Sequence, residues 1–234
     1  MNEMEYAKCF DYYRYRAGLK KRQFSYYLNS LSINPQKGQE QAFEAITAFT
    51  ENYLLEKKPD GLLLVGGVGS GKTFMVSSVV NNIIDQINEE EILQTGLPND
   101  YILEDITVNF NWFDRCIDYA CFISVTELFE KLKASIAAQE SYFYDRMLHH
   151  LKTVQLLVLD DLGAEKSSEW TKSVLFEIID YRYNEMLPML ITTNCPPKEL
   201  KEKIGDRSYD RIREMCALVP VTAESQRKTA EIFL

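Results

Sequence analysis

The chain of 234 residues lacks the features that mark membrane, secreted or zinc-binding proteins. No apolar run approaches the roughly 18 residues of a transmembrane helix, so we expect no membrane contact. The N-terminal residues contain no apolar core of the kind found in a secretory signal. Only two histidines are present, adjacent at His149 and His150, which argues against a zinc site.

The cysteines also lack the pattern that disulfide frameworks and metal sites require. They are five in number, scattered, and without Cys-x-x-Cys spacing. We therefore expect reduced thiols in a cytoplasmic protein. The positions are Cys9, Cys116, Cys121, Cys195 and Cys216.

The net charge of −9 is unevenly distributed. Residues 85–118 hold nine acidic residues against Arg115 alone, whereas residues 1–35 hold six basic and three acidic residues. An acidic total therefore does not exclude nucleic acid as a partner, because a local basic surface can still meet phosphates.

Residues 1–35 form a first segment, rich in tyrosine, arginine and lysine, that we expect to be helical. Its aromatic side chains could pack on the main domain. Alternatively, the segment could be a docking or nucleic-acid arm, with tyrosines stacking on bases and basic groups on phosphates.

Strands alternating with helices along the remaining chain predict an α/β fold with a parallel sheet. We expect strands at 62–65, 121–125, 155–163, 189–194 and 217–221. We expect helices at 36–58, 72–87, 126–138 with Thr126 as N-cap, 142–151, 168–186 and 199–215. The acidic residues 88–118, with a small strand at 106–113, interrupt this alternation and are interpreted as an insertion.

A phosphate-binding loop is predicted between the first strand and its helix. The sequence GGVGSGKT fits G-x-x-x-x-G-K-[ST] in full. Glycines let consecutive backbone N–H groups wrap a polyphosphate, and the next helix points its positive end at the anion. Lys72 is expected on the β- and γ-phosphates and the Thr73 hydroxyl on Mg²⁺. The expected nucleotide-binding residues are Gly66, Gly67, Val68, Gly69, Ser70, Gly71, Lys72, Thr73 and Phe74.

Polar side chains follow two later strands. The buried strand LLVL delivers Asp160 and Asp161 to the carboxyl edge of the sheet, where ligands bind in open α/β folds. We expect Asp160 to hold Mg²⁺ and Asp161 to orient or activate the attacking water. The strand LITTN, residues 190–194, ends in Asn194, whose amide could lie between the γ-phosphate and that water.

Arginines near the C-terminus suggest two further contacts. Arg207, Arg211 and Arg213 are clustered on or beside a helix. They could form a solvated face paired with neighbouring acids, or one of them could reach a neighbouring subunit's γ-phosphate as an arginine finger. Arg227 could contact phosphates within its own subunit.

Several motifs in series resemble the AAA+ ATPases of the DnaC/DnaI helicase-loader and IstB-type group. They are LLVLDDLGAEKSSEW, LFEIIDYRYNEMLPMLITTN, ELKEKIGDRSYDRIRE and the closing ESQR. The resemblance runs in order from about Ala17 to Arg227, and residues 17–27 look like the lead-in segment that lies beside the adenine.

This resemblance implies a P-loop NTPase of the ASCE/AAA+ type, a three-layer sandwich with strand order 5-1-4-3-2, over residues 36–234. It implies ATP as substrate with Mg²⁺ as cofactor, Asn194 as the first sensor and Arg227 as the second. Arg211 would be the finger acting in trans, with Arg207 as second choice. The implied function is loading or remodelling a replicative helicase as an ATP-dependent homo-oligomer that contacts single-stranded DNA.

Other functions stay open at this stage. An IstB-like transposition helper would share the same motifs. A small-molecule kinase would need an acceptor pocket, and a non-hydrolysing switch would not need both Asp160 and Asp161. The chain also departs from typical loaders, because only a short segment with the single Cys9 precedes the ATPase core, and because of the insertion, which is either a partner-binding element or surface decoration.

Overall fold

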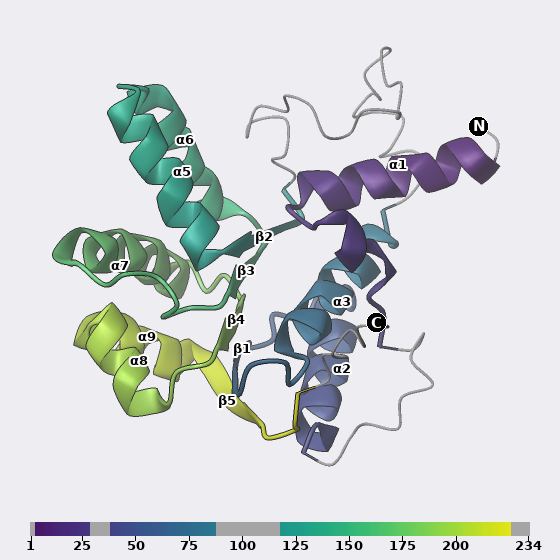
Figure 1. Cartoon of the computed structure of the whole chain (residues 1–234). Helices are drawn as coiled ribbons and strands as arrows, with labels where there is room; N and C mark the ends of the chain where they lie inside the picture. The colour runs from purple at the N-terminus through teal and green to yellow at the C-terminus, as the bar shows by residue number, and fades with distance from the viewer. Residues whose placement is uncertain (1–2, 29–37, 88–117, 226–234) are drawn as a thin grey trace, which may run out of the picture.

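A parallel β-sheet forms the centre of the computed structural model, which describes residues 3–28, 38–87 and 118–225 (Figure 1). Its strands are β1 (Gly61–Gly66), β2 (Ala120–Ser124), β3 (Leu156–Asp160), β4 (Met189–Thr193) and β5 (Cys216–Val221). They lie in the order β2-β3-β4-β1-β5, and every neighbouring pair is parallel. This is the predicted order 5-1-4-3-2 seen from the opposite edge, so that prediction is confirmed.

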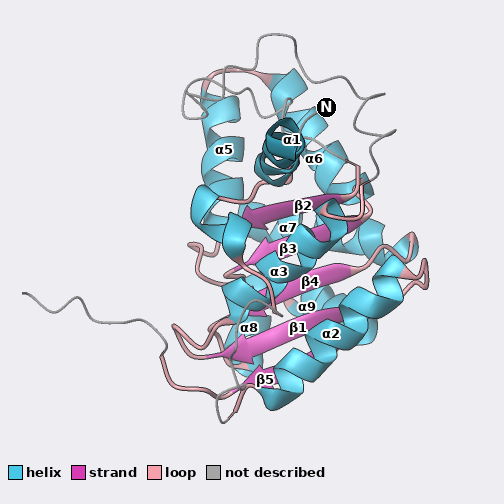
Figure 2. Ribbon diagram, turned by 90° about the vertical axis from the view of Figure 1, so that its right-hand side faces the viewer, coloured by secondary structure: helices cyan, strands magenta, loops and turns pink. Residues whose placement is uncertain are grey.

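Helices cover both faces of the sheet and complete the predicted three-layer sandwich (Figures 1 and 2). One face carries α1 (Glu3–Arg16), the short 3₁₀ helix η1 (Lys21–Ser25), α2 (Glu40–Leu54) and α3 (Lys72–Ile84). The other carries α5 (Val125–Ala137), α6 (Ser141–Thr153), α7 (Glu169–Asn184), α8 (Pro197–Ile204) and α9 (Asp206–Met215).

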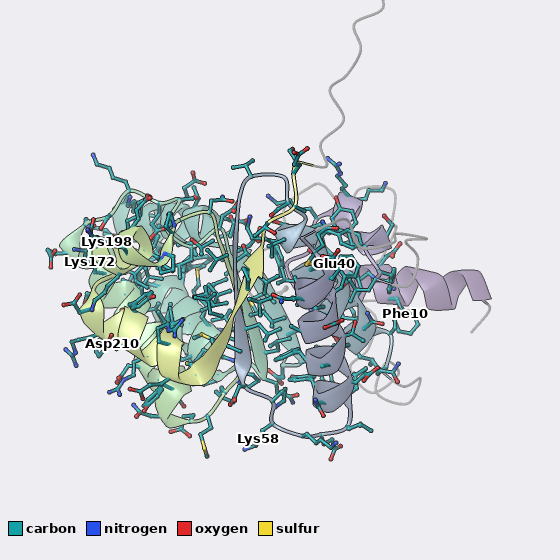
Figure 3. The ribbon with its side chains drawn as sticks, turned by 90° about the horizontal axis from the view of Figure 1, so that it is seen from below. Phe10, Glu40, Lys58, Lys172, Lys198 and Asp210 are labelled. Atoms are coloured by element: carbon teal, nitrogen blue, oxygen red, sulfur yellow. The ribbon has the colours of Figure 1, made fainter. Side chains whose placement is uncertain are left out.

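Successive side chains of each central strand enter different cores. In β1, Leu62 and Leu64 join the core beneath α2 and α3, whereas Leu63 joins the core beneath α5 and α7. A strand buried on both faces must be apolar at every position, which explains the unbroken run LLLV. Figure 3 shows side chains filling both layers, with Glu40 and Asp210 on opposite sides of the sheet.

The N-terminal helix α1 packs against α3, on one face of the sheet. Cys9, Tyr12 and Tyr13 are buried in the core of the α2–α3 face. Arg14 donates to Asp85, at 2.5 Å, and to the hydroxyl of Tyr27, at 2.6 Å. Packing, the first of our two interpretations, is therefore correct for this helix, and base stacking is wrong for Tyr12 and Tyr13.

Two local predictions are wrong. The helix expected at 199–215 is two helices, because Gly205 between them has φ 88° and ψ 154°, which no helix accommodates. The N-cap of α5 is Ser124 rather than Thr126, since the Ser124 hydroxyl accepts a hydrogen bond from the Glu127 backbone N–H at 3.2 Å.

Some predictions fall on residues outside the described ranges. They are the insertion, apart from residue 118, the boundary between 35 and 36, Cys116 and Arg227. The other cysteines, Cys9, Cys121, Cys195 and Cys216, are buried and form no disulfide among the described residues. Among the residues that the structure describes, no helix has both the length and the apolar character needed to cross a bilayer.

The fully buried Arg182 of α7 ties the end of α6 to the sheet. Its guanidinium donates to five backbone carbonyls, those of Leu151, Lys152, Val154, Gln155 and Pro188. Burial lowers its pKa to about 10. The charge is therefore retained at neutral pH, compensated by carbonyl dipoles.

We expect Arg182→Met to lower the free energy of unfolding by about 3 kcal/mol or more, because several buried carbonyls lose their donor together. Urea denaturation measures this loss. The matched control is Arg146→Met, an exposed arginine of α6, which should change stability by less than about 0.5 kcal/mol. Equal effects of the two substitutions would contradict the assigned role of Arg182.

Candidate nucleotide-binding site

A glycine-rich loop connects β1 to α3 and requires glycine at three of its positions. Gly69 and Gly71 have φ of 82° and 97°, a region that side chains with a Cβ rarely adopt. A Cβ on Gly66 would lie 2.1 Å from the carbonyl oxygen of Val221 in β5. At Gly67 an added Cβ would meet nothing within 4 Å, so packing does not require glycine there.

The ammonium of Lys72 lies inside this loop. Its Nζ donates to the carbonyl oxygens of Gly66, at 2.9 Å, and Gly67, at 2.8 Å, and to Asn194 Oδ1, at 2.9 Å. The residue is 5% exposed. A buried cation at a helix N-terminus is suited to an anion, and phosphate oxygens can replace the carbonyl acceptors it now holds.

Asp160, at the end of β3, is bonded to hydroxyl groups from two other elements. Thr73 Oγ1 donates to its carboxylate, with 3.1 Å to each oxygen, and Thr192 Oγ1 donates to Oδ1 at 2.7 Å. A carboxylate and a hydroxyl that converge in this way supply the oxygen ligands that Mg²⁺ prefers. The pair Thr73 and Asp160 therefore fits the metal predicted from the sequence.

The pKa of Asp160 is raised to about 6, first by burial and then by the neighbouring charge of Asp161, while hydrogen bonds from Thr192 and Thr73 oppose the rise. Burial without a compensating cation makes the charged form unfavourable. A divalent cation at this position would reverse that balance and favour the ionised carboxylate.

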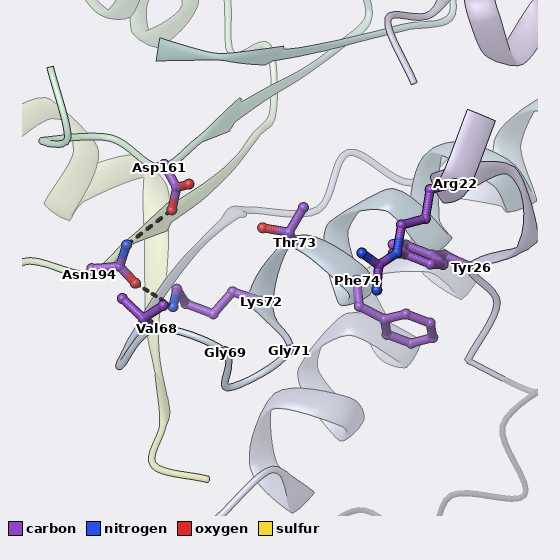
Figure 4. Close-up of a pocket in the computed structure, with 10 residues that line it drawn as sticks. All are labelled: Arg22, Tyr26, Val68, Gly69, Gly71, Lys72, Thr73, Phe74, Asp161 and Asn194. Carbon is purple, nitrogen blue, oxygen red and sulfur yellow. Dashed lines mark hydrogen bonds between the residues drawn. The ribbon is translucent and has the colours of Figure 1, made fainter. Parts of the chain in front are cut away.

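Asp161 and Asn194 form the link between the acidic edge and the loop (Figure 4). Asp161 has φ 58°, and its backbone N–H donates to Thr192 Oγ1 at 2.9 Å. This conformation, uncommon outside glycine, directs its carboxylate to Asn194, whose Nδ2 donates to Oδ1 at 3.1 Å. A continuous chain of hydrogen bonds thus runs from Lys72 through Asn194 to Asp161.

These residues line a cleft of about 960 Å³, together with side chains that the sequence did not single out. Arg22 and Tyr26 extend the cleft beside Phe74, and the rings of Tyr26 and Phe74 lie 4.9 Å apart (Figure 4). Asn81 holds this segment by donating to the carbonyl oxygen of Tyr26 at 2.9 Å. The resemblance pointed to residues 17–27, but no pattern within them distinguished Arg22 and Tyr26.

The predicted finger residue lies away from this cleft. Arg211 of α9 is bonded to Asp180 of α7, with 2.9 Å from Nε to Oδ1, and is not among the residues that line the cleft. Arg207 lies one turn earlier, with its Cζ 3.9 Å from the ring centroid of Phe176. Arg211 is therefore paired with an acid of another helix rather than with the neighbouring acids of its own helix.

The sheet order, the loop after β1 and the acidic pair at the end of β3 define the P-loop NTPase fold. Comparisons with known proteins agree. The family described as "IstB-like ATP binding protein" matches residues 117–232, a range that includes Asp160, Asp161, Asn194 and the α9 arginines. Replicative helicase loader DnaI of Bacillus subtilis is 27% identical over 199 residues, covering 79% of this chain and 53% of that protein.

Further relatives and solved structures carry similar names. Replicative helicase loader DnaC of Escherichia coli K12 is 32% identical over 69 residues, covering 30% of this chain and 28% of that protein. A crystal structure of the DnaC helicase loader matches with a TM-score of 0.60 and 25% identity, covering 86% of this chain and 99% of that one. A crystal structure of DnaI matches with a TM-score of 0.62 and 24% identity, over 89% and 94% of the two chains.

These findings confirm the resemblance to AAA+ ATPases of the DnaC/DnaI and IstB group. The chain spans about half the length of the DnaI protein and about a third of the DnaC proteins that it matches. The similarity therefore concerns only a part of those proteins.

The raised pKa of Asp160 predicts an unusual dependence of stability on pH. Its pKa is about 6 in the folded protein against an ordinary 3.8, so the folded state holds this proton more tightly than the unfolded chain. The resulting stabilisation is complete below the ordinary pKa and is lost as pH rises through 6. Between pH 4 and 8, Asp160→Asn should gain up to about 3 kcal/mol of stability relative to the wild type.

Thermal unfolding of both proteins across this pH range, in buffer with EDTA and no nucleotide, measures the difference. A stability difference that stays constant with pH would show that Asp160 does not titrate as described.

Proposed function

We propose that this protein is a Mg²⁺-dependent ATPase that loads or remodels a replicative helicase, with ATP bound at interfaces between subunits of a homo-oligomer. The observation that carries the proposal is the hydrogen-bonded chain from Lys72 through Asn194 to Asp161, beside the Thr73–Asp160 pair. This arrangement supplies a phosphate cation, oxygen ligands for a metal, and a carboxylate that can hold water. The names of the relatives supply the link to helicase loading.

The residues of the loop would bind the triphosphate. Lys72 would exchange its carbonyl and amide acceptors for β- and γ-phosphate oxygens. Thr73 and Asp160 would hold Mg²⁺, which when bound neutralises phosphate charge and orients the γ-phosphate. Tyr26, Phe74 and Arg22 would contact the base side of the nucleotide, since aromatic rings and a guanidinium plane suit a purine.

Hydrolysis would require a water positioned in line with the γ-phosphate. Asp161 would orient this water and accept its proton, while Asn194 would lie between the water and the phosphate. The described hydrogen bond between Asp161 and Asn194 keeps both groups at the same edge of the sheet. When the nucleotide binds, Lys72 would leave Asn194. The side-chain amide of Asn194 would then be free for this task.

Arginines would complete the site at an oligomer interface. We assign Arg211 as the group that acts in trans on the γ-phosphate of a neighbouring subunit, with Arg207 as second choice. Arg227 would contact the phosphates in its own subunit. Such completion would couple hydrolysis to assembly.

The proposed partners are a replicative helicase and single-stranded DNA, which would place the protein in the cytoplasm. The DNA contact rests on basic residues in segments 1–35 and 198–228. Arg14 is an unsuitable contributor, since it is paired with Asp11 and Asp85. The alternative is an IstB-like transposition helper, which the family match over residues 117–232 supports.

We expect the double variant Asp160→Asn with Asp161→Asn to bind ATP with largely unchanged affinity. Its rate of ATP hydrolysis should fall by about 100-fold or more. Titration with a fluorescent ATP analogue and phosphate release measure the two quantities. Asp145→Asn, at an exposed carboxyl of α6, is the control. Undiminished turnover in the double variant would refute the assignment of the acids.

Helicase loading itself is tested with the replicative helicase from the same genome and circular single-stranded DNA. With ATP, the wild type should increase the amount of helicase retained on the circles, whereas Lys72→Ala should not. Stimulation of a transposase from that genome, with no effect on the helicase, would instead establish the transposition role.

A further inference from the structure

Helices α7 and α9 present matched rows of side chains to each other. Phe176, Asp180 and Tyr183 lie four and three residues apart on α7, a spacing that places them on one face of the helix. Arg207, Arg211 and Glu214 have the same type of spacing on α9. These rows meet in order, with Arg207 over Phe176, Arg211 against Asp180, and Glu214 against the hydroxyl of Tyr183.

Arg211 is held in this row by two different contacts. Its Nε donates to Asp180 Oδ1 at 2.9 Å, and its Cζ lies 4.2 Å from the ring centroid of Tyr183. The ion pair fixes one edge of the guanidinium, and the ring fixes its plane. Because the guanidinium is a rigid planar fork, Nε–H shares one edge with one terminal NH₂ group, and the other terminal NH₂ group lies away from that edge.

Both supporting side chains are themselves anchored. Asn184, one turn after Asp180, donates from Nδ2 to Asp180 Oδ2 at 3.3 Å. The Tyr183 hydroxyl donates a short hydrogen bond to Glu214. Hence the carboxylate and the ring that meet Arg211 are each restrained by a second contact.

The exposure of these groups shows that the arrangement is not part of the core. The side chains of Arg211 and Asp180 are 35% and 29% exposed. Exposed ion pairs contribute little to stability. We therefore interpret the contacts of Arg211 as fixing the orientation of its guanidinium rather than as stabilising the fold. Figure 3 shows the neighbouring Asp210 at the outer surface, on the side of the sheet away from α2.

We propose that Asp180 and Tyr183 are positioning residues that orient Arg211 toward the ATP site of a neighbouring subunit. This inference rests on the proposed function, in which Arg211 acts in trans. A flexible arginine would have to be ordered in each catalytic cycle, whereas one held at Nε and stacked on a ring presents its terminal NH₂ groups in a fixed direction. Asp180 and Tyr183 would not touch the nucleotide.

The test compares ATP turnover in Asp180→Asn, Arg211→Ala and their double variant. We expect Asp180→Asn to reduce maximal turnover by roughly tenfold to a hundredfold with an unchanged KM for ATP. The double variant should be no slower than Arg211→Ala alone, since Asp180 acts only through that arginine. Tyr183→Ala should also be impaired, and Tyr183→Phe, which keeps the ring, should restore most of the activity.

The matched control is Glu177→Gln, on the same helix. Glu177 forms an ion pair with Lys152 at 2.9 Å, the length of the pair between Asp180 and Arg211. Its loss should leave turnover unchanged. Melting temperatures of all variants report any general loss of structure, which would affect the Asp180 and Glu177 variants alike.

Mixed oligomers test whether Asp180 acts across the interface. Subunits with Lys72→Ala have a defective phosphate loop but an intact Arg211 and Asp180. Added to Asp180→Asn subunits, they should raise turnover above the sum of the two proteins measured separately. A cis role of Asp180 would give no such recovery.

The outcomes separate this inference from the proposed function. If Arg211→Ala is slow and Asp180→Asn is as fast as the wild type, the positioning role is wrong and the trans arginine stands. If Asp180→Asn is faster than the wild type, Asp180 sequesters Arg211, and the inference is likewise overturned. If Arg211→Ala turns over ATP normally, or light scattering shows no assembly of the wild type with an ATP analogue, both fail.

Discussion

The position of one buried ammonium group, that of Lys72, determines how the proposed site is organised. A charge with so little solvent must be compensated by nearby oxygen atoms. The loop carbonyls of Gly66 and Gly67 and the amide oxygen of Asn194 supply them. The same contacts curl the loop around the lysine and tie it to the end of β4. An incoming triphosphate can therefore compete for a cation that already lies at the centre of the site.

The parallel sheet makes this convergence unavoidable. Because β1, β3 and β4 are adjacent and run in one direction, the residues that follow them meet at a single edge. The glycine-rich loop, the acidic pair and Asn194 are separated from one another by tens of residues in the chain. Direct hydrogen bonds nevertheless join them in the fold. The strands are buried between the two layers of helices, and the polar positions of β3 and β4, which are Asp160, Thr192 and Thr193, lie at the ends that form this edge.

Much of this was predictable from the sequence, and the reasons are physical. The apolar runs that lead to Lys72, Asp160 and Asn194 predict parallel strands, and the glycine spacing predicts the loop; the strand order itself came from the family resemblance. By contrast, the φ of 58° at Asp161 and the break at Gly205 depend on single backbone dihedrals. The contacts of Arg22 and Tyr26 with the cleft depend on how a distant segment packs against α3, which no local pattern encodes.

The surface outside the cleft was least predictable. The arginines of α9 could be recognised as a cluster, but their partners on α7 come from another part of the chain. Asp180, Tyr183 and Glu214 surround Arg211 only because α7 and α9 pack side by side. Pairing of two helix faces depends on tertiary packing, so the orientation of Arg211 had to be observed rather than derived.

A structure of the protein with Mg²⁺ and a non-hydrolysable ATP analogue would test the central claim most directly. The account predicts that Lys72 Nζ leaves Gly67 and Asn194 and lies about 3 Å from β- and γ-phosphate oxygens, a normal hydrogen-bond distance, with the metal between Thr73 and Asp160. Phosphates bound elsewhere, with Lys72 still bonded to Gly66, Gly67 and Asn194, would contradict it.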